Sequence, residues 1–480
     1  MIAPLGTRIR RVLLSLLVLA APAGPAFAAW PHSPDIYTPI APSTGNQVVA
    51  QVLPDGIGGA FFLFTDTRGG TEDVYVQRVT ATGNLAPGWP VSGLQVAAIA
   101  AQKLTPQMTN DASDGVIVVW VDRRTGNGDI YAQHVLGNGT LAGGSWPGTG
   151  LAVFNPGNEQ RRPQICTDGS GGAWITWERS FSNTDTDVYA AHVTSGGTMP
   201  FRNVIDNSLH DSRQISMASD AAGGFFVAYQ DSSSLFQGCQ RIFGIHANAA
   251  GALVYGPANF VLELTGYRDI NPKIVADGSG GLEVAWQNNQ THASYDLEAQ
   301  RFSATLTPGL VAMGTSWGLD TPDYNVIADG TGGMILSWQE RFGHAMVGRA
   351  GPGGFALGWP IDLGNIGFGP PVPLASDRSG GAIAVFGNGL TAQRLPVNGG
   401  SVTRWGTGVL LNANGSQTAA VSSDGGHGAI VGWTNFTSAF NYQLYAQRVD
   451  GFGALGNAEP ALTSIKDIAG DQGGHIRLAW

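Results

Sequence analysis

The sequence contains few charged residues, and acidic residues outnumber basic ones. Charged side chains make up 12% of the 480 residues, with 35 Asp and Glu against 25 Lys and Arg, for a net charge of -10. Proteins that bind nucleic acid neutralise phosphates with clustered Lys and Arg. Because no such cluster occurs along this chain, we do not expect nucleic acid to be a partner.

Cysteine is almost absent as well, since only Cys166 and Cys239 occur. Two cysteines cannot form a disulfide framework, and without a C-x-x-C spacing they do not indicate a metal site. A bridge between them requires their backbones to lie within bonding distance, which the sequence does not establish. A Cys166 to Cys239 disulfide and two separate buried thiols therefore both remain open.

Long apolar runs are missing except near the start of the chain. There, Arg8, Arg10 and Arg11 precede the apolar run 12–21, and Ala26-Phe27-Ala28 has the small-x-small pattern of a cleavage site. The run is too short to span a bilayer, and no later stretch is longer. We therefore expect residues 1–28 to be a signal peptide, and the mature protein to be secreted to the extracellular space or cell surface, with the periplasm as an alternative.

An aspartate is followed nine positions later by an aromatic residue at nine places in the chain. The pairs are Asp55/Phe64, Asp111/Trp120, Asp168/Trp177, Asp220/Tyr229, Asp277/Trp286, Asp329/Trp338, Asp377/Phe386, Asp424/Trp433 and Asp471/Trp480. Aromatic residues are only 9% of the sequence, so this regularity indicates one structural unit repeated along the chain. The period of about 50 residues is typical of a four-stranded propeller blade.

The third copy shows how one unit is built. Residues 173–178 (AWITWE) alternate with the two-residue period of a strand, and the preceding DGSGG is a hairpin turn in which glycine supplies positive φ. A glycine stands four positions after the aspartate in eight of the nine copies. The run 163–167 (PQICT) before the turn and two further runs of strand character complete the unit, so we predict four strands per copy and an all-β fold.

Such a sheet leaves both faces apolar, and closing a ring covers the end sheets that an open array would expose. We expect one domain, residues 29–480, forming a single β-propeller of eight four-stranded blades, or nine if the termini complete another. Residues 35–47 resemble a fourth strand and exit turn ahead of the first unit, so a closing blade shared between the termini is one arrangement. A chain truncated inside a ninth unit is the other.

The segments DGSGGAWITW and DASDGVIVVWVDRRTGNGDIYAQHV resemble the repeats of exported bacterial β-propeller proteins. The resemblance covers residues 48–480 and implies architecture, because most members of that family have no assigned activity. The Asp box and the arginine triad of sialidases have no convincing counterpart in the sequence.

A mostly acidic or amide series stands two positions after the aromatic residues, where the loop from the second to the third strand begins. Such a ring on one rim of a propeller could hold a cation, with calcium as the candidate, or hydrogen-bond to sugar hydroxyls. Short polar side chains that cap turns are the simpler explanation. The candidate binding residues are Asp66, Asp122, Arg124, Asp231, Asn288 and Glu340.

A second periodic series lies on the third strand, and it exchanges Arg and His freely: Arg78, His134, His192, His246, Arg301, Arg394 and Arg448. This recurrence favours a structural role over anion binding. Residues that break the repeat are better candidates for catalysis, such as Glu283, Glu298, Arg162 and His344. A glycosidase would need Glu283 and a second acid across a cleft, and the sequence does not identify a catalytic set.

The loops between the second and third strands are long in copies three to six and shrink to GNG in copy seven. Variable loops on a rigid ring are where binding specificity usually resides. We therefore expect a monomeric, non-enzymatic protein that binds a protein or polysaccharide through one rim and needs no cofactor. The alternatives are a carbohydrate-active hydrolase or lyase with its site in the central funnel, and a structural spacer of a larger cell-surface protein.

Overall fold

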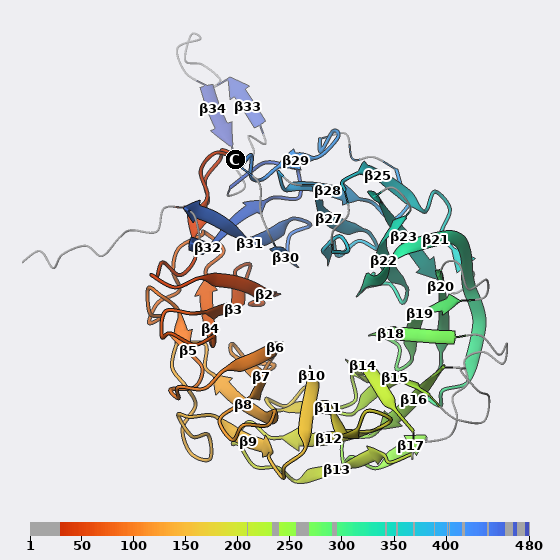
Figure 1. Cartoon of the computed structure of the whole chain (residues 1–480). Coiled ribbons are helices and arrows are strands. Elements are labelled where there is room, and N and C mark those ends of the chain that lie inside the picture. The colour runs from red at the N-terminus through yellow and green to blue at the C-terminus, as the bar shows by residue number, and fades with distance from the viewer. Residues whose placement is uncertain are drawn as a thin grey trace, which may run out of the picture.

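The computed structural model describes residues 29–480 apart from 209, 233–239, 256–267, 290–294, 341–342, 352–353, 368–369, 388, 401, 403, 415–417, 439–440, 457–463, 468–475 and 480. Every named element in this part of the chain is a strand. The strands form eight antiparallel blades around a central channel (Figure 1). The protein is an eight-bladed β-propeller, as the repeat predicted. No helix in the described residues is long and apolar enough to cross a bilayer.

Within each blade, consecutive strands run from the channel to the outside of the ring. The innermost strands are β2 (Gln47–Pro54), β6 (Lys103–Asn110), β10 (Glu159–Thr167), β14 (Ser212–Ser219), β18 (Arg268–Ala276), β26 (Leu374–Ser376) and β30 (Thr418–Ser423). The second strands are β3 (Ala60–Asp66), β7 (Val116–Asp122), β11 (Ala173–Ser182), β15 (Phe225–Asp231), β19 (Leu282–Asn289), β22 (Met334–Glu340), β27 (Ala382–Phe386) and β31 (Ala429–Ser438).

The third strands carry the Arg or His series. They are β4 (Asp73–Val79), β8 (Asp129–Val135), β12 (Asp185–Val193), β16 (Arg241–Ala247), β20 (Tyr295–Phe302), β23 (His344–Gly351), β28 (Thr391–Leu395) and β32 (Asn441–Val449). The outermost strands are shorter: β5 (Leu94–Gln95), β9 (Leu151–Phe154), β13 (Phe201–Asp206), β17 (Leu253–Tyr255), β24 (Gly354–Phe355), β25 (Ile361–Asn365) and β29 (Val409–Leu410). One long strand, β21 (Pro308–Ala328), is outermost in blade five and continues as the innermost strand of blade six.

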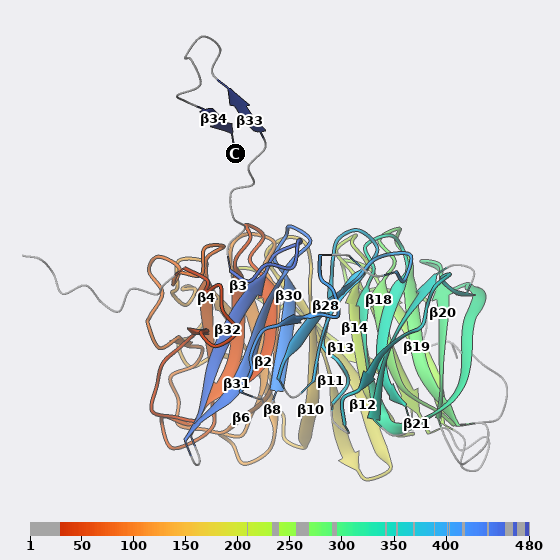
Figure 2. The same ribbon diagram turned by 90° about the horizontal axis from the view of Figure 1, so that it is seen from above.

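The ring is closed by the N-terminal segment. Strand β1 (Thr38–Pro39) pairs with β32, so that blade eight consists of β30, β31, β32 and β1. The shared closing blade expected from residues 35–47 is thus confirmed. The last two strands, β33 (Ser464–Asp467) and β34 (Ile476–Ala479), pair with each other and lie apart from the ring (Figures 1 and 2). The ring therefore closes with eight blades, while the ninth Asp/aromatic pair, Asp471 and Trp480, falls outside the described residues.

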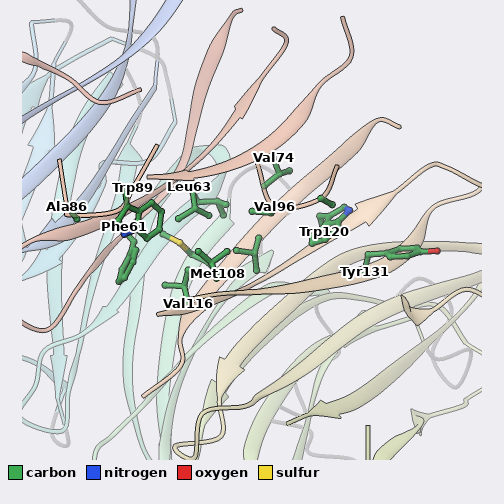
Figure 3. Packing of buried hydrophobic residues seen from close by; sticks show 14 residues of the cluster. Phe61, Leu63, Val74, Ala86, Trp89, Val96, Met108, Val116, Trp120 and Tyr131 are labelled. Carbon is green, nitrogen blue, oxygen red and sulfur yellow. The ribbon is translucent and has the colours of Figure 1, made fainter. Parts of the chain in front are cut away.

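The core lies between blades, because each second strand is buried on both faces. All seven residues of β3 and all seven of β7 are buried. Between blades one and two, Phe61 and Leu63 pack with Met108, Val116 and Trp120 (Figure 3). This arrangement explains why one blade cannot be stable alone: each sheet must bury both of its apolar faces against neighbours.

The turn that begins each copy is built around its aspartate. In copy three, Asp168 Oδ1 accepts hydrogen bonds from the backbone N–H groups of Ser170 (2.7 Å) and Gly172 (2.9 Å). Gly171 has a φ of +92°, the left-handed region that glycine adopts easily. Gly172 is needed for a different reason, since a Cβ there would lie 2.5 Å from the carbonyl oxygen of Val193. The predicted hairpin turn is confirmed.

Cys166 is a free thiol buried in the core between blades three and four. Burial, together with the nearby Asp220 and Asp168, raises the pKa of this thiol far above its usual range. Cys239 lies outside the described residues.

Candidate functional site

The innermost strands surround a central cavity of about 900 Å³. Its walls include Gln51 from β2, Gln107 from β6, Gln164 from β10, Lys273 from β18 and Asn325 from β21. A cavity of this size is within the range that proteins use for ligands. The propeller fold thus brings side chains from most of its blades to one central space.

The polar side of the cavity follows from one position of the repeat, four residues before each turn aspartate. This position holds Gln51, Gln107, Gln164, Ser216, Lys273, Asn325, Pro373 and Ala420 in blades one to eight. The first six are polar, and some of them join adjacent blades. Gln51 Oε1 accepts a hydrogen bond from Met108 N at 2.9 Å, and Ser216 Oγ accepts one from Ile274 N at 3.1 Å.

Blades seven and eight provide the apolar side. Pro370, Pro371 and Pro373 line the cavity beside the short strand β26. Proline has no N–H to donate, so it shortens the pairing of this strand and is tolerated because the strand lies at the edge of its sheet. Leu390 and Gly387, from the short loop of copy seven, also line the cavity. The short loop of copy seven therefore contributes to the wall of the central cavity.

A second hollow of about 570 Å³ adjoins the cavity, since Gln164, Lys273 and Asn325 line both. Arg162 and Asp323 lie in its wall, and Asp323 Oδ1 is 2.8 Å from Lys273 Nζ. The buried carboxyl of Glu178 contacts Arg162, with Glu178 Oε1 3.4 Å from Arg162 Nη1. Burial raises the pKa of Glu178 in spite of the nearby Arg162.

Three of the candidate binding residues, Asp66, Asp122 and Arg124, are engaged in contacts within the protein. Asp66 accepts hydrogen bonds from Arg68 Nη2 (2.6 Å) and Ser43 Oγ (2.7 Å). Asp122 binds Arg124, with Nη2 to Oδ2 at 2.7 Å, while the Arg124 guanidinium lies 3.8 Å from the ring centre of Tyr131. Burial alone would raise the pKa of Asp122, but the hydrogen bonds of Arg124 and Trp120 outweigh it and hold that pKa below its usual value.

The other three candidates lie at the same end of their blades. Asp231 accepts hydrogen bonds from Ser208 and Ser212, both at 3.1 Å, and its burial raises its pKa. Asn288 donates to Asp269 Oδ1 at 2.9 Å. Glu340 accepts a hydrogen bond from Trp338 Nε1 at 3.4 Å. None of the six is among the described residues that line the cavity, so the rim series and the cavity are separate features.

The Arg and His series on the third strand forms a tie in every blade. Each side chain binds the second oxygen of its own turn aspartate, as in His134 Nε2 to Asp111 Oδ2 at 2.8 Å and Arg78 Nε to Asp55 Oδ2 at 3.2 Å. Several also reach the next blade, for example through Arg78 Nη1 to the carbonyl oxygen of Gly137 at 3.0 Å. The structural role predicted for this series is confirmed, and Arg349, which the sequence pattern missed, makes the tie in blade six.

These ties act on the aspartates electrostatically. Burial would raise the pKa of Asp111, but hydrogen bonds from His134, Ser113 and Gly115 outweigh it, so the pKa lies below its usual value. The pKa values of Asp277 and Asp329 are lowered in the same way. Burial would raise them, but hydrogen bonds from the turn and from Arg301 or Arg349 outweigh it. Asp111, Asp277 and Asp329 are therefore charged structural groups whose carboxylates are engaged by the turn and by the third strand.

Glu283 breaks the repeat, since most copies have an apolar residue at its position. Its side chain is buried, and Oε1 has no hydrogen-bond partner. Burial, reinforced by the charge of Asp329, raises its pKa to about 8. Among the described residues it does not line the cavity, so it does not meet the geometry that a glycosidase acid would need there. His344 pairs instead with the exposed Asp362 at 3.0 Å.

Within the described part of the chain, no three His, Cys, Asp or Glu side chains come together as a metal site. Calcium binding stays a prediction from the sequence. The cavity-lining position was missed, although a signal for it exists: a polar residue recurs four positions before the aspartate in six of the eight blades.

No protein-family model matches the sequence, and no curated protein is similar to it at a significant level. Solved structures with a similar shape include an ulvan polysaccharide lyase (TM-score 0.45, 10% identity, covering 90% of this chain and 95% of that one). A fucose-specific lectin from Aleuria aurantia is also similar (TM-score 0.35, 9% identity, covering 66% of this chain and 97% of that one). These likenesses are too remote to indicate a function.

Proposed function

We propose that this protein is a secreted, non-enzymatic binding protein that takes part of a polysaccharide into its central cavity. The observation that carries the proposal is the row of side-chain amides on the cavity wall, Gln51, Gln107, Gln164 and Asn325. An amide both donates and accepts hydrogen bonds, as a sugar hydroxyl does. The apolar wall of blades seven and eight complements the C–H faces of a sugar ring.

The proposed binding surface is the central cavity, in place of the rim loops expected from the sequence. The rim residues Asp66, Asp122 and Asp231 are buried and already hydrogen-bonded. The amides on the wall are partly accessible, so a ligand can reach them without breaking the fold.

Binding to a glycan array, followed by titration calorimetry with the best polymer, tests the proposal. Replacing both Gln107 and Gln164 by Leu should weaken binding at least about tenfold, because two buried hydrogen bonds are lost. Gln102→Leu is a matched control. Gln102 directly precedes the strand that carries Gln107, is exposed, and lies outside the cavity. Unchanged affinity in the double variant, or an equal loss in the control, would contradict the proposal.

The same incubations test the alternative of a hydrolase or lyase. A binding protein leaves the polymer intact, whereas an enzyme produces new reducing ends or unsaturated sugars that accumulate with time. Export is tested separately by N-terminal sequencing of the secreted protein, which should begin at Ala29. Trp30 is fully buried in the closed ring. Cleavage after Ala28 would leave Trp30 close to the new N-terminus and free to insert into the ring.

A further inference from the structure

The charged side chains of the central channel are concentrated in the 570 Å³ hollow beside the main cavity. Arg162 from blade three, Lys273 from blade five and Asp323 from blade six all line it. Among the described residues that line either space, these three are the charged ones. Two cations and one anion therefore face the same volume from three different blades.

The backbone around the hollow is held in an unusual conformation. Arg162, Gln214 and Asn271 have φ values of +47°, +54° and +55°, and all three line the hollow. Each lies where the pairing register of its innermost strand shifts. A left-handed residue other than glycine costs about 1–3 kcal/mol and persists where the surrounding structure enforces it, often at ligand sites.

The same bulge occurs in blade two, where Thr105 has a φ of +46° and does not line the hollow. The conformation is therefore a property of four consecutive blades, and the side chain at the bulge is what differs between them. Copy three places an arginine there, where copies two, four and five have Thr, Gln and Asn. This difference gives the hollow its guanidinium.

Glu178 is also an exception to the repeat, and it supports Arg162. Its Oε1 accepts a hydrogen bond from Gln214 N at 2.7 Å. In the next blade the equivalent residue is Gln230, whose side-chain amide oxygen accepts a hydrogen bond from Asn271 N at 3.3 Å. An amide would therefore suffice for this backbone bond. The carboxyl of Glu178 additionally lies under Arg162, while its Oε2 is buried without a partner. Burial raises the pKa of Glu178, which reduces its ability to neutralise Arg162.

Both cations remain accessible to a ligand. The Arg162 side chain is 53% exposed, and its contact with Glu178 is long, at 3.4 Å. The Lys273 side chain is 24% exposed. Its Nζ pairs with Asp323, whose side chain is 56% exposed, and also donates a hydrogen bond to the carbonyl oxygen of Tyr324. Exposed pairs of this kind contribute about 0–1 kcal/mol, so an incoming anion can take the place of Asp323, which then turns to water.

We infer that the hollow selects an anionic sugar, binding its charged group between Arg162 and Lys273 while the hydroxyls contact Gln164, Gln214 and Asn325. This inference rests on the proposed function and names its substrate class, an acidic polysaccharide. The shared chemistry is a carboxylate or a sulfate ester, either of which accepts several hydrogen bonds from guanidinium and ammonium groups.

The test compares polymers that differ only in charge, by titration calorimetry with the full-length mature protein. One arm uses oligogalacturonate and its fully methyl-esterified form, and a second uses a sulfated galactan and its desulfated form. The charged member of at least one pair should bind about tenfold more tightly or better, since one charge-assisted contact contributes about 1.5–3 kcal/mol. The arm that shows the difference identifies the anion.

Three variants locate the effect. Arg162→Gln and Lys273→Gln should each weaken binding of the charged polymer about tenfold and leave the neutral polymer within about twofold. Arg213→Gln removes one charge from the adjacent blade, outside the hollow, where Arg213 pairs with Asp211, and it should bind as wild type. Thermal melting of each variant separates loss of binding from loss of folding.

The outcomes distinguish the two claims. Equal binding of charged and neutral polymers overturns this inference and leaves the proposed function standing. An equal loss in Arg213→Gln also overturns it, because the effect would then be a general one of net charge. Failure of every polymer to bind overturns the proposed function together with the inference.

Discussion

The indole nitrogen of Trp30 donates a hydrogen bond to the carbonyl oxygen of Ala81, 3.0 Å away in the first blade. Trp89, Trp146, Trp359 and Trp405 make the same kind of bond from their own blade to the next, as in Trp89 Nε1 to Gly137 O at 2.9 Å. Trp30 thus occupies in blade eight the place that a tryptophan of the repeat occupies elsewhere. The N-terminal segment supplies the part that the last copy lacks.

Replacing Trp30 by Ala should lower the free energy of unfolding by about 3–5 kcal/mol, because a fully buried indole and its hydrogen bond are lost at the closure. Denaturant unfolding followed by tryptophan fluorescence measures this. Ile36→Ala is the control, since Ile36 belongs to the same segment but is 62% exposed, and it should change stability by less than about 0.5 kcal/mol. Similar effects of the two substitutions would argue against closure by Trp30.

Replacing Asp329 by Asn should destabilise the protein by about 3–5 kcal/mol, because Arg349 would lose its charged partner inside the structure. Asp362→Asn is the matched control, since it breaks an exposed pair with His344 and should cost less than about 1 kcal/mol. Melting temperatures of both variants provide the comparison. Equal changes would show that the ties contribute no more than surface pairs.

The hydrogen bonds to the turn aspartates also determine how the stability of the fold depends on pH in acid. Because the native pKa values of Asp111, Asp277 and Asp329 are lowered, the unfolded chain takes up protons first, and stability is lost as the pH falls below about 4 through the native values. This acid dependence should be shallower in Asp329→Asn than in the wild type.

Glu283 should have the opposite dependence. Its native pKa is about 8 against an ordinary value of 4.5, so between these values the folded state retains a proton that the unfolded chain releases. Stability should therefore fall as the pH rises from about 4.5 to 8, by up to about 1.4 kcal/mol per pH unit. Glu283→Gln should remove this slope and melt at a higher temperature than the wild type at pH 8. A lower melting temperature at that pH would refute this account of Glu283.

Cys166 should be unreactive in the folded protein, because its thiol is buried and its pKa is raised. In a Cys239→Ser background, a thiol reagent such as Ellman's should modify no group before unfolding and one group after it. Rapid reaction of the native variant would contradict the buried position.

The architecture could be predicted from the sequence because each copy carries the same turn residues at the same spacing. The aspartate and the glycine four positions later are needed by the same turn in every blade, so their spacing is visible without coordinates. The sequence pattern missed Arg349 because copy six reads HAMVGRAG and lacks the aromatic and glutamine residues that mark most of the other third strands. Its partner, Asp329, nevertheless accepts the same bond.

The cavity was harder to predict than the fold. Its lining depends on which face of each innermost strand meets the channel, and the register shift in those strands alters the alternation of inward and outward residues. Arg162, Lys273 and Asp323 lie in three different copies, and only the closed ring brings them to one hollow. The rim aspartates recur in agreement with the simpler explanation, turn capping, since Asp66 and Asp122 each accept a hydrogen bond from the backbone N–H two residues further on.

The central claim is that the N-terminal strand completes the last blade of an eight-bladed ring. Thr38 and Ala446 are cross-strand partners in that blade, so cysteines at these two positions, in a Cys166→Ala and Cys239→Ser background, test it directly. Under oxidation the account predicts an intramolecular disulfide in the monomer and a melting temperature above that of the reduced form. Absence of the crosslink, or disulfide-linked dimers in its place, would contradict it.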